Sequence, residues 1–278
     1  MTTRTKTRRH TLCWGTLRHL ALADLIGVAG RTGFAAVTAS VVQHGVEIRE
    51  KHAQLVDLCH STGVQVECVE PIISPLPGLR DKSEVSEQLR AFLVHGADDV
   101  FECAVALGAR SVNIAHFLGR PHDLNELASA VDALAVRADS HGLLATVEFI
   151  PGTGIASLDD ALRVVSLAGR PNVRLVIDVW HVGAAGMSAS DLDRVPQELI
   201  HAVQLCDKSD SPSSNPSVFS HRLLPGHGSL PLQDIVAAAF RNNPRVDLQV
   251  EVFNDDLTRT MTPDDISVAA HDALDELV

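Results

Sequence analysis

The chain has no tyrosine, no long apolar run and no dense basic segment beyond its first nine residues. Without tyrosine, acid–base catalysis by a phenol is excluded. No apolar stretch reaches the roughly 18 residues that a membrane span requires, and no uninterrupted apolar segment follows the basic N-terminal residues, so we expect a cytoplasmic protein with no membrane partner. The net charge of −12 and the shortage of basic clusters also disfavour a nucleic-acid partner.

Several common motifs are also absent. The five cysteines form no CxxC pair and their number is odd, which favours reduced, mostly buried thiols over a disulfide framework or a zinc knuckle. The sequence contains no GxSxG, P-loop or HExxH motif, so serine hydrolases, Walker-type nucleotidases and zincin proteases have no support. No GxGxxG motif follows the first expected strand, which disfavours an open dinucleotide-binding sheet.

The chain does show a regular alternation of short apolar runs with amphipathic segments. The runs that predict strands are HTLCWGTL, AAVTAS, VQVECVEP, SVNIAH, LLATVEFI, VRLVIDVWH, IHAVQLCD and VDLQVEVF. The predicted helices cover approximately residues 20–30, 47–61, 86–107, 123–140, 158–169, 232–242 and 263–278, with another from about residue 190. No linker interrupts this alternation. We therefore expect an α/β protein in which residues 10–278 form a single (β/α)8 TIM barrel, preceded by a frayed N-terminus over residues 1–9.

Polar residues at the ends of four apolar runs predict a functional site. These residues are Glu148, Asp178, Gln204 and Glu251. A carboxylate in an apolar strand is unfavourable unless it is paired, hydrogen-bonded or bound to a metal. A buried hydrogen-bond network would explain any one of them, but four at matching strand ends indicate one metal site at the mouth of the barrel. Because all four donors are oxygens, we expect one divalent ion, Mn²⁺ or Mg²⁺, with Co²⁺ or Zn²⁺ also accepted.

Other polar and aromatic residues are expected near the same mouth. His181 follows the sixth strand, where it could exchange a proton near the metal or simply cap a helix. Arg222 lies after the seventh strand and could hold a hydroxyl, carboxylate or phosphate group of a substrate. Glu70 and His116 end the third and fourth strands, either as substrate contacts or as partners of the metal ligands. Trp14, at the end of the first strand, either walls the pocket or packs in the core.

The segments VEFIPGTG, VIDVWH, VQLCD, RLLPGHGSLPL and VEVF, in this order and spacing, resemble the xylose isomerase-like TIM barrel superfamily of sugar phosphate isomerases and epimerases. The resemblance spans nearly the whole chain. It implies that one divalent metal is bound by Glu148, Asp178, Gln204 and Glu251. It also implies that His181 and Arg222 contact the substrate. The epimerases usually have histidine where this chain has Gln204, whereas glutamine there is similar to the bacterial 3-dehydroshikimate dehydratases.

The resemblance implies a metal-dependent isomerase or epimerase that removes a proton next to the carbonyl of a small sugar or polyhydroxy ketone, with Glu148 and Glu251 as the proton-transfer pair. The alternative is a dehydratase or lyase with the same enolate chemistry, either 3-dehydroshikimate dehydratase-like or acting on a keto-glycoside, with His181 as the base. An endonuclease IV-like nuclease would need more histidines and a basic face, and a sugar-binding barrel without activity would not need the metal ligands. The sequence does not identify the substrate, the metal or the oligomeric state. A homo-oligomer is possible.

Overall fold

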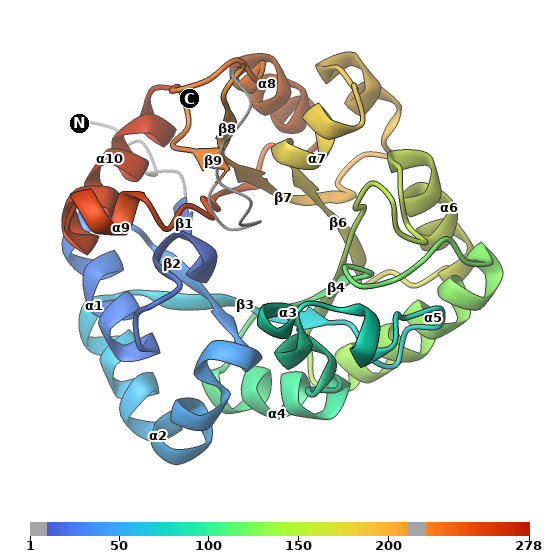
Figure 1. The fold of residues 1–278 in the computed structure, drawn as a ribbon, viewed down its shortest axis with the longest axis horizontal. Coiled ribbons are helices and arrows are strands. Elements are labelled where there is room, and N and C mark those ends of the chain that lie inside the picture. The colour runs from blue at the N-terminus through green and yellow to red at the C-terminus, as the bar shows by residue number, and fades with distance from the viewer. Residues whose placement is uncertain (1–9, 211–220) are drawn as a thin grey trace, which may run out of the picture.

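The strands form the inner wall of a closed barrel, and helices surround it (Figure 1). The computed structural model describes residues 10–210 and 221–278, so the predicted frayed N-terminus, residues 1–9, lies outside the described residues. Within them, eight parallel strands form the barrel: β1 (His10–Leu12), β2 (Ala36–Ser40), β3 (Gln65–Ile72), β4 (Ser111–Ala115), β5 (Leu144–Glu148), β6 (Val173–Asp178), β7 (Ile200–Leu205) and β10 (Asp247–Val250). Strand β1 pairs with both β2 and β10, which closes the sheet and confirms the predicted (β/α)8 TIM barrel.

Helices connect successive strands and cover the outside of the barrel. The longer ones are α1 (Leu22–Thr32), α2 (Val41–Thr62), α4 (Ala97–Leu107), α5 (Leu124–Ser140), α6 (Leu158–Ala168), α7 (Val179–Ala184), α8 (Leu232–Asn242) and α10 (Pro263–Asp275). Shorter segments are α3 (Glu87–Arg90), α9 (Leu257–Thr260) and the 3-10 turns Trp14–Leu17, Lys82–Glu84, Ala91–Leu93 and Ala189–Arg194. A small antiparallel sheet joins β8 (Asp207–Lys208) to β9 (Arg222–Leu223). No helix in the described part of the chain is long and apolar enough to cross a membrane.

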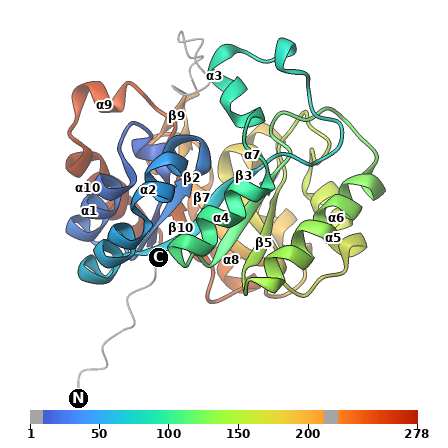
Figure 2. The ribbon, with the colours of Figure 1, turned by 90° about the horizontal axis from the view of Figure 1, so that it is seen from below.

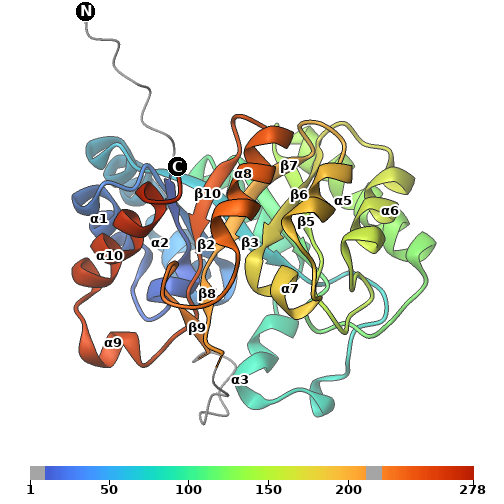
Figure 3. The same cartoon turned by 90° about the horizontal axis from the view of Figure 1, so that it is seen from above.

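The two ends of the barrel have different surroundings. Because all barrel strands are parallel, their carboxyl ends meet at one end of the barrel. Figures 2 and 3 show α3 and β9 at that end, whereas the C-terminus lies towards the opposite end. The loops that follow the strands therefore surround a single mouth.

Burial and capping explain why these residues form these elements. Strands β4 and β10 are buried along their whole length, as expected for a parallel sheet covered on both faces. Helix α5 begins where the Asp123 side chain accepts the backbone N–H groups of Asn125 and Glu126. Helix α6 begins where the Ser157 hydroxyl accepts the N–H of Asp160. The five cysteines are all buried free thiols, as the sequence predicts.

The predicted helix over residues 86–107 is interrupted in the structure. Helix α3 and a 3-10 turn come first, and α4 starts only after Gly96. The Gly96 N–H donates to the Asp99 side chain at 3.1 Å, which starts a new helix at this glycine. The sequence predicted one continuous helix because the residues on both sides of Gly96 follow an amphipathic helical pattern.

Three other predicted boundaries also differ. The first strand ends at Leu12, and Trp14 lies on the 3-10 turn that follows it. Helix α2 begins at Val41, six residues before the predicted start at Glu47, because the chain turns into the helix directly after β2. The helix predicted from residue 190 is a 3-10 turn, and α7 precedes it immediately after β6.

Candidate active site

A cavity of about 220 Å³ opens at the mouth that the carboxyl ends of the strands form. Its aromatic wall consists of Trp14, Phe92, Phe117, Trp180 and Phe253. Its polar groups are Glu70, Asn113, Glu148, His181, Arg222 and Glu251. An apolar wall with a few convergent polar groups is the usual composition of a small-molecule site.

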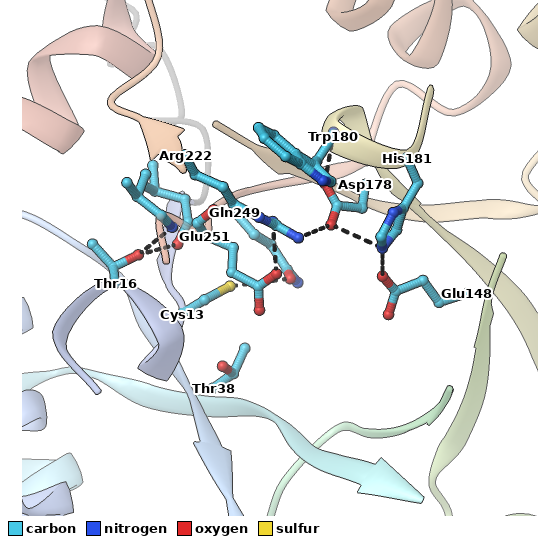
Figure 4. Close-up of polar contacts among 12 residues, drawn as sticks. Cys13, Thr16, Thr38, Glu148, Asp178, Trp180, His181, Arg222, Gln249 and Glu251 are labelled. Atoms are coloured by element: carbon cyan, nitrogen blue, oxygen red, sulfur yellow. Dashed lines mark hydrogen bonds and ion pairs between the residues drawn. The ribbon is translucent and has the colours of Figure 1, made fainter. Parts of the chain in front are cut away.

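Five of the predicted residues form one connected polar network in or beside this cavity (Figure 4). The Nε2 atom of His181 lies 3.2 Å from Glu148 Oε1 and 3.5 Å from Asp178 Oδ2. Arg222 donates from Nη2 to Asp178 Oδ2 at 2.8 Å and from Nη1 to Glu251 Oε2 at 3.1 Å. Residues from β5, β6, β9 and the end of β10 therefore meet at one point, as the strand-end pattern predicts.

The backbone at the end of β6 places two of these groups. Asp178 is the last residue of the strand and caps α7, since its Oδ1 atom accepts the N–H of Trp180 at 2.8 Å. Its other oxygen, Oδ2, accepts a hydrogen bond from Arg222 and lies beside His181. His181 lies three residues later on the first turn of α7, so its ring lies beside the same carboxylate.

Arg222 is held by a loop that Asp207 organises. The Asp207 carboxylate accepts the backbone N–H groups of Gly226, Gly228 and Leu230 at 2.8 to 3.1 Å. A Cβ atom on Gly228 would lie 2.3 Å from the carbonyl oxygen of Lys208, so only glycine fits there. This loop continues from β9 and fixes the strand that carries Arg222.

Charge pairing raises the pKa values of both basic groups. Burial by itself would lower the pKa of His181, but the carboxylates of Asp178 and Glu148 outweigh it and raise that pKa above its ordinary value. Burial would likewise lower the pKa of Arg222, and the carboxylates of Asp178 and Glu251 raise it instead. Both side chains therefore favour their cationic forms beside the carboxylates.

The acidic groups at the mouth are crowded. Burial and the nearby Glu148 carboxylate raise the pKa of Glu70 to about 7. Burial, together with Glu70 and Asp178, raises the pKa of Glu251 well above its ordinary value, although Arg222 opposes this. The acidic groups at the mouth therefore outnumber the described basic groups that pair with them.

Gln204 lies next to this network but does not line the cavity. It pairs in register with Asp178 on the neighbouring strand β6 and is 2% exposed. Its Oε1 atom accepts no hydrogen bond from any residue that the structure describes. Glu148, Asp178 and His181 offer ligand atoms that all lie within 4.8 Å of one another. The structure thus brings two of the predicted ligands together with His181, and it places Arg222 between Asp178 and Glu251.

Trp14 and Glu70 both line the cavity and contact each other. The indole Nε1 of Trp14 donates to Glu70 Oε1 at 3.1 Å, and the Trp14 backbone N–H donates to Thr38 Oγ1 at 3.1 Å. The ring of Trp14 also packs edge-on against Phe253, with centroids 5.6 Å apart. The indole thus forms part of the pocket wall.

His116 lies among the loops at the same mouth but is not one of the described residues that line the cavity. Its Nδ1 accepts the N–H of Gly154 at 2.9 Å, and its Nε2 lies 2.8 Å from the carbonyl oxygen of Pro77. A Cβ atom on Gly119 would lie 2.0 Å from the ring, so the imidazole fills a tight space between loops. His116 therefore braces the loops after β3 and β5.

Sequence reasoning missed Asn113 and much of the aromatic wall. Asn113 Nδ2 donates to Glu148 Oε2 at 3.0 Å and to Glu70 Oε2 at 3.4 Å. Its Oδ1 accepts the Thr146 hydroxyl at 2.9 Å, which fixes the orientation of the amide. The sequence signal that could have identified Asn113 is its polar amide side chain inside the apolar run SVNIAH. Of the wall residues, Trp180 could have been found because it lies two residues after Asp178, the last residue of β6.

Comparison with known proteins supports the fold. A curated relative, the inosose isomerase of Halalkalibacterium halodurans, is 28% identical over 118 residues, which is 42% of this chain and 42% of that protein. The match therefore spans less than half of the relative's length. The solved structure of the IOLI protein with a binding zinc atom has a TM-score of 0.80 at 17% identity and covers 97% of this chain and 98% of that one.

Another solved structure of similar fold carries a different activity in its name. The structure of the probable 3-DHS dehydratase AsbF from Bacillus anthracis has a TM-score of 0.73 at 12% identity, covering 96% of this chain and 98% of that one. The family model described as xylose isomerase-like TIM barrel matches residues 26–277. Since this match and the closed barrel agree over nearly the whole chain, the protein belongs to the xylose isomerase-like TIM barrel family.

Proposed function

We propose that the chain is a divalent-metal-dependent isomerase or epimerase of a small sugar or polyhydroxy ketone. The observation that carries this proposal is the pair of buried glutamates, Glu148 and Glu251, that line one cavity from different strands. His181 and Arg222 lie between them (Figure 4). The inosose isomerase, which this chain matches over 42% of that protein's length, is by its name an enzyme of the same reaction class.

The residues at the mouth fit a divalent cation. Four buried carboxylates, those of Glu70, Glu148, Asp178 and Glu251, face only Arg222 and His181 as cationic groups among the described lining residues and their partners. The buried Gln204 Oε1 lacks a hydrogen-bond donor beside them. Glu148, Asp178, Gln204 and Glu251 would hold the ion through oxygen atoms, which favours Mn²⁺ or Mg²⁺ over softer metals. When bound, such an ion supplies Lewis-acid polarisation of the substrate carbonyl.

Proton transfer is assigned to the two glutamates. A substrate in the cavity would lie between Glu148 on β5 and Glu251 beyond β10. One carboxylate removes the proton from the carbon next to the carbonyl, and the other returns a proton to the opposite face or to the neighbouring carbon. The first outcome is an epimer and the second an isomer.

Arg222 and His181 are assigned to the substrate oxygens. The Arg222 fork is packed near the rings of Trp180 and Phe253, 5.7 and 5.1 Å from their centroids, which restricts its orientation. Protonated His181 can donate to a hydroxyl or to an oxygen that gains charge during the reaction. The aromatic wall gives the same space an apolar side that would favour displacement of water by a bound substrate.

A lyase is the second candidate, because this chain has a glutamine at position 204 and a histidine at the cavity. In this reaction His181 acts in its neutral form and removes the proton, and a hydroxyl or alkoxy group leaves from the next carbon. The similarity in fold to the probable 3-DHS dehydratase makes 3-dehydroshikimate a compound to test.

Hydrogen exchange with solvent tests the proposal even when the product has not been identified. The purified chain is incubated in D2O with Mn²⁺ and a panel of keto-sugars, inososes and 3-dehydroshikimate, and NMR follows deuterium at the carbon next to the carbonyl. An epimer or isomer that carries deuterium supports the isomerase, whereas an unsaturated product supports the lyase. Saturated products that carry no deuterium at the reacting carbons contradict the isomerase, and the absence of any unsaturated product contradicts the lyase. Glu102→Gln, an exposed substitution on α4, is the control and should behave as wild type.

A further inference from the structure

A second cluster of metal-type ligands lies at the end of the barrel opposite to the cavity. It consists of His10, the first residue of β1, with His271 and Asp275 near the end of α10. Strand β1 enters the barrel at its amino-terminal end, so these residues lie far from the mouth described above. His271 and Asp275 are four residues apart and share one face of the helix.

The distances within the cluster suit ligands of a shared ion. His10 Nδ1 lies 3.6 Å from Asp275 Oδ1, and His271 Nδ1 lies 3.5 Å from Asp275 Oδ2. These separations exceed the roughly 2.7–3.2 Å of an ordinary N–H···O hydrogen bond. Two ligands of a tetrahedral Zn²⁺ ion with bonds of about 2.0–2.1 Å are about 3.3 Å apart. One ligand atom from each of the three residues lies within 4.8 Å of the others.

Packing holds the His271 ring in place before any ion binds. The ring contacts His10 and Phe34 edge-on, with centroid distances of 5.1 and 5.2 Å. Gly33 ends α1 with a φ of 94°, and a Cβ atom there would lie 3.1 Å from His271 Nε2. The Nε2 side of the ring therefore faces the Gly33 backbone, and Nδ1 faces Asp275. A rigid imidazole loses little entropy when it binds a metal.

The cluster is open to solvent on one side. The His10 side chain is 4% exposed and that of His271 21%, whereas Asp275 is 59% exposed. An ion could thus enter past Asp275 and keep water as a further ligand, as Zn²⁺ does in three-ligand sites. Two imidazoles and one carboxylate favour Zn²⁺ or Co²⁺ over Mg²⁺ or Mn²⁺.

We propose that His10, His271 and Asp275 form a second metal site that binds one Zn²⁺ ion and ties the first barrel strand to the last helix. Strand β1 closes the barrel between β2 and β10, so the ion stabilises the closure of the sheet. The site is independent of the metal proposed for the mouth, since it shares no residue with it.

Zinc stoichiometry in untagged full-length variants tests this site. Asp275→Ala removes the exposed ligand with little risk to folding, and Asp272→Ala on the same exposed side of α10 is the matched control. Zn²⁺ is added to chelator-treated protein and followed by calorimetry, with the melting temperature measured with and without the ion. We expect wild type and Asp272→Ala each to bind one more Zn²⁺ ion than Asp275→Ala. If Asp275→Ala still binds this ion, its affinity should be at least about 100-fold lower.

A second background separates the two sites. The double variant Asp178→Asn/Glu251→Gln should lose the ion at the mouth and bind a single Zn²⁺ ion at the second site. Adding His271→Phe to this double variant should abolish binding of that remaining ion. Phenylalanine keeps an aromatic ring against Phe34 and removes the ligand. The proposal is overturned if Asp275→Ala and His271→Phe bind as many Zn²⁺ ions as their parents, with the same affinity and the same rise in melting temperature.

Discussion

Arg222→Met should destabilise the metal-free protein strongly. The Arg222 side chain is 10% exposed and bonds to Asp178 and Glu251, which are 0% and 8% exposed. The substitution leaves both buried carboxylates without this partner. Loss of one member of a buried ion pair typically costs about 3–5 kcal/mol, which lowers the melting temperature of a domain of this size by roughly 6–20 °C.

A surface arginine provides the matched control. Arg241 Nη2 lies 2.8 Å from Asp193 Oδ1, but the two side chains are 60% and 54% exposed. Exposed pairs contribute about 0–1 kcal/mol, so Arg241→Met should lower the melting temperature by at most about 4 °C. Circular dichroism melts at one heating rate, in the presence of a chelator, compare the two variants with wild type.

Adding a divalent ion should narrow the difference between Arg222→Met and wild type. The ion would neutralise the same carboxylates that the arginine neutralises, and an ion that binds only the folded state stabilises it further. If Arg222→Met melts no more than about 4 °C below wild type without metal, the ion pairs of Arg222 contribute no more than a surface pair, and these carboxylates do not depend on a cationic partner.

Three other substitutions test the chemistry and the core. Glu251→Gln should reduce turnover by more than about tenfold while circular dichroism shows the wild-type fold, because it removes a ligand charge and a proton-transfer group; a smaller loss of turnover assigns Glu251 neither role. Gln204→His should keep metal binding and shift the ratio of elimination to epimerisation, measured by NMR of the products; an unchanged ratio on every substrate would mean that the glutamine does not select the reaction. Burial and Glu67 raise the pKa of Asp247 to about 7, so the folded state holds a proton that the unfolded state releases, and stability falls as pH rises from about 4 to about 7. Asp247→Asn should remove this fall in urea unfolding between about pH 4 and about pH 7, and a variant with the wild-type pH dependence would show that Asp247 is not the group responsible.

The barrel and the location of its mouth could be predicted from the sequence for a physical reason. Parallel strands covered on both faces read as continuous apolar runs, and their carboxyl ends meet at one end of the barrel. Polar residues that end such runs, such as Asp178 and Glu148, therefore converge. The pairing of Asp178 with Gln204 in register follows from the same geometry.

The contacts of individual side chains could not be predicted, because they depend on loops. His116 turns into a space that Gly119 and Gly154 leave open, although it directly follows a strand like the site residues. Arg222 bridges Asp178 and Glu251 only because the Asp207 carboxylate folds the following loop. Spacing along the sequence carries no information about either arrangement.

We propose that residues from four strands hold one catalytic divalent ion at the mouth of the barrel. Anomalous diffraction from a crystal soaked in Mn²⁺ tests it most directly. We expect one anomalous peak bound by Glu148, Asp178, Gln204 and Glu251, with ligand distances of about 2.0–2.3 Å. Arg222 should then no longer bridge Asp178 and Glu251. A mouth without a peak at saturating Mn²⁺, or an ion that contacts neither Glu148 nor Glu251, would contradict it.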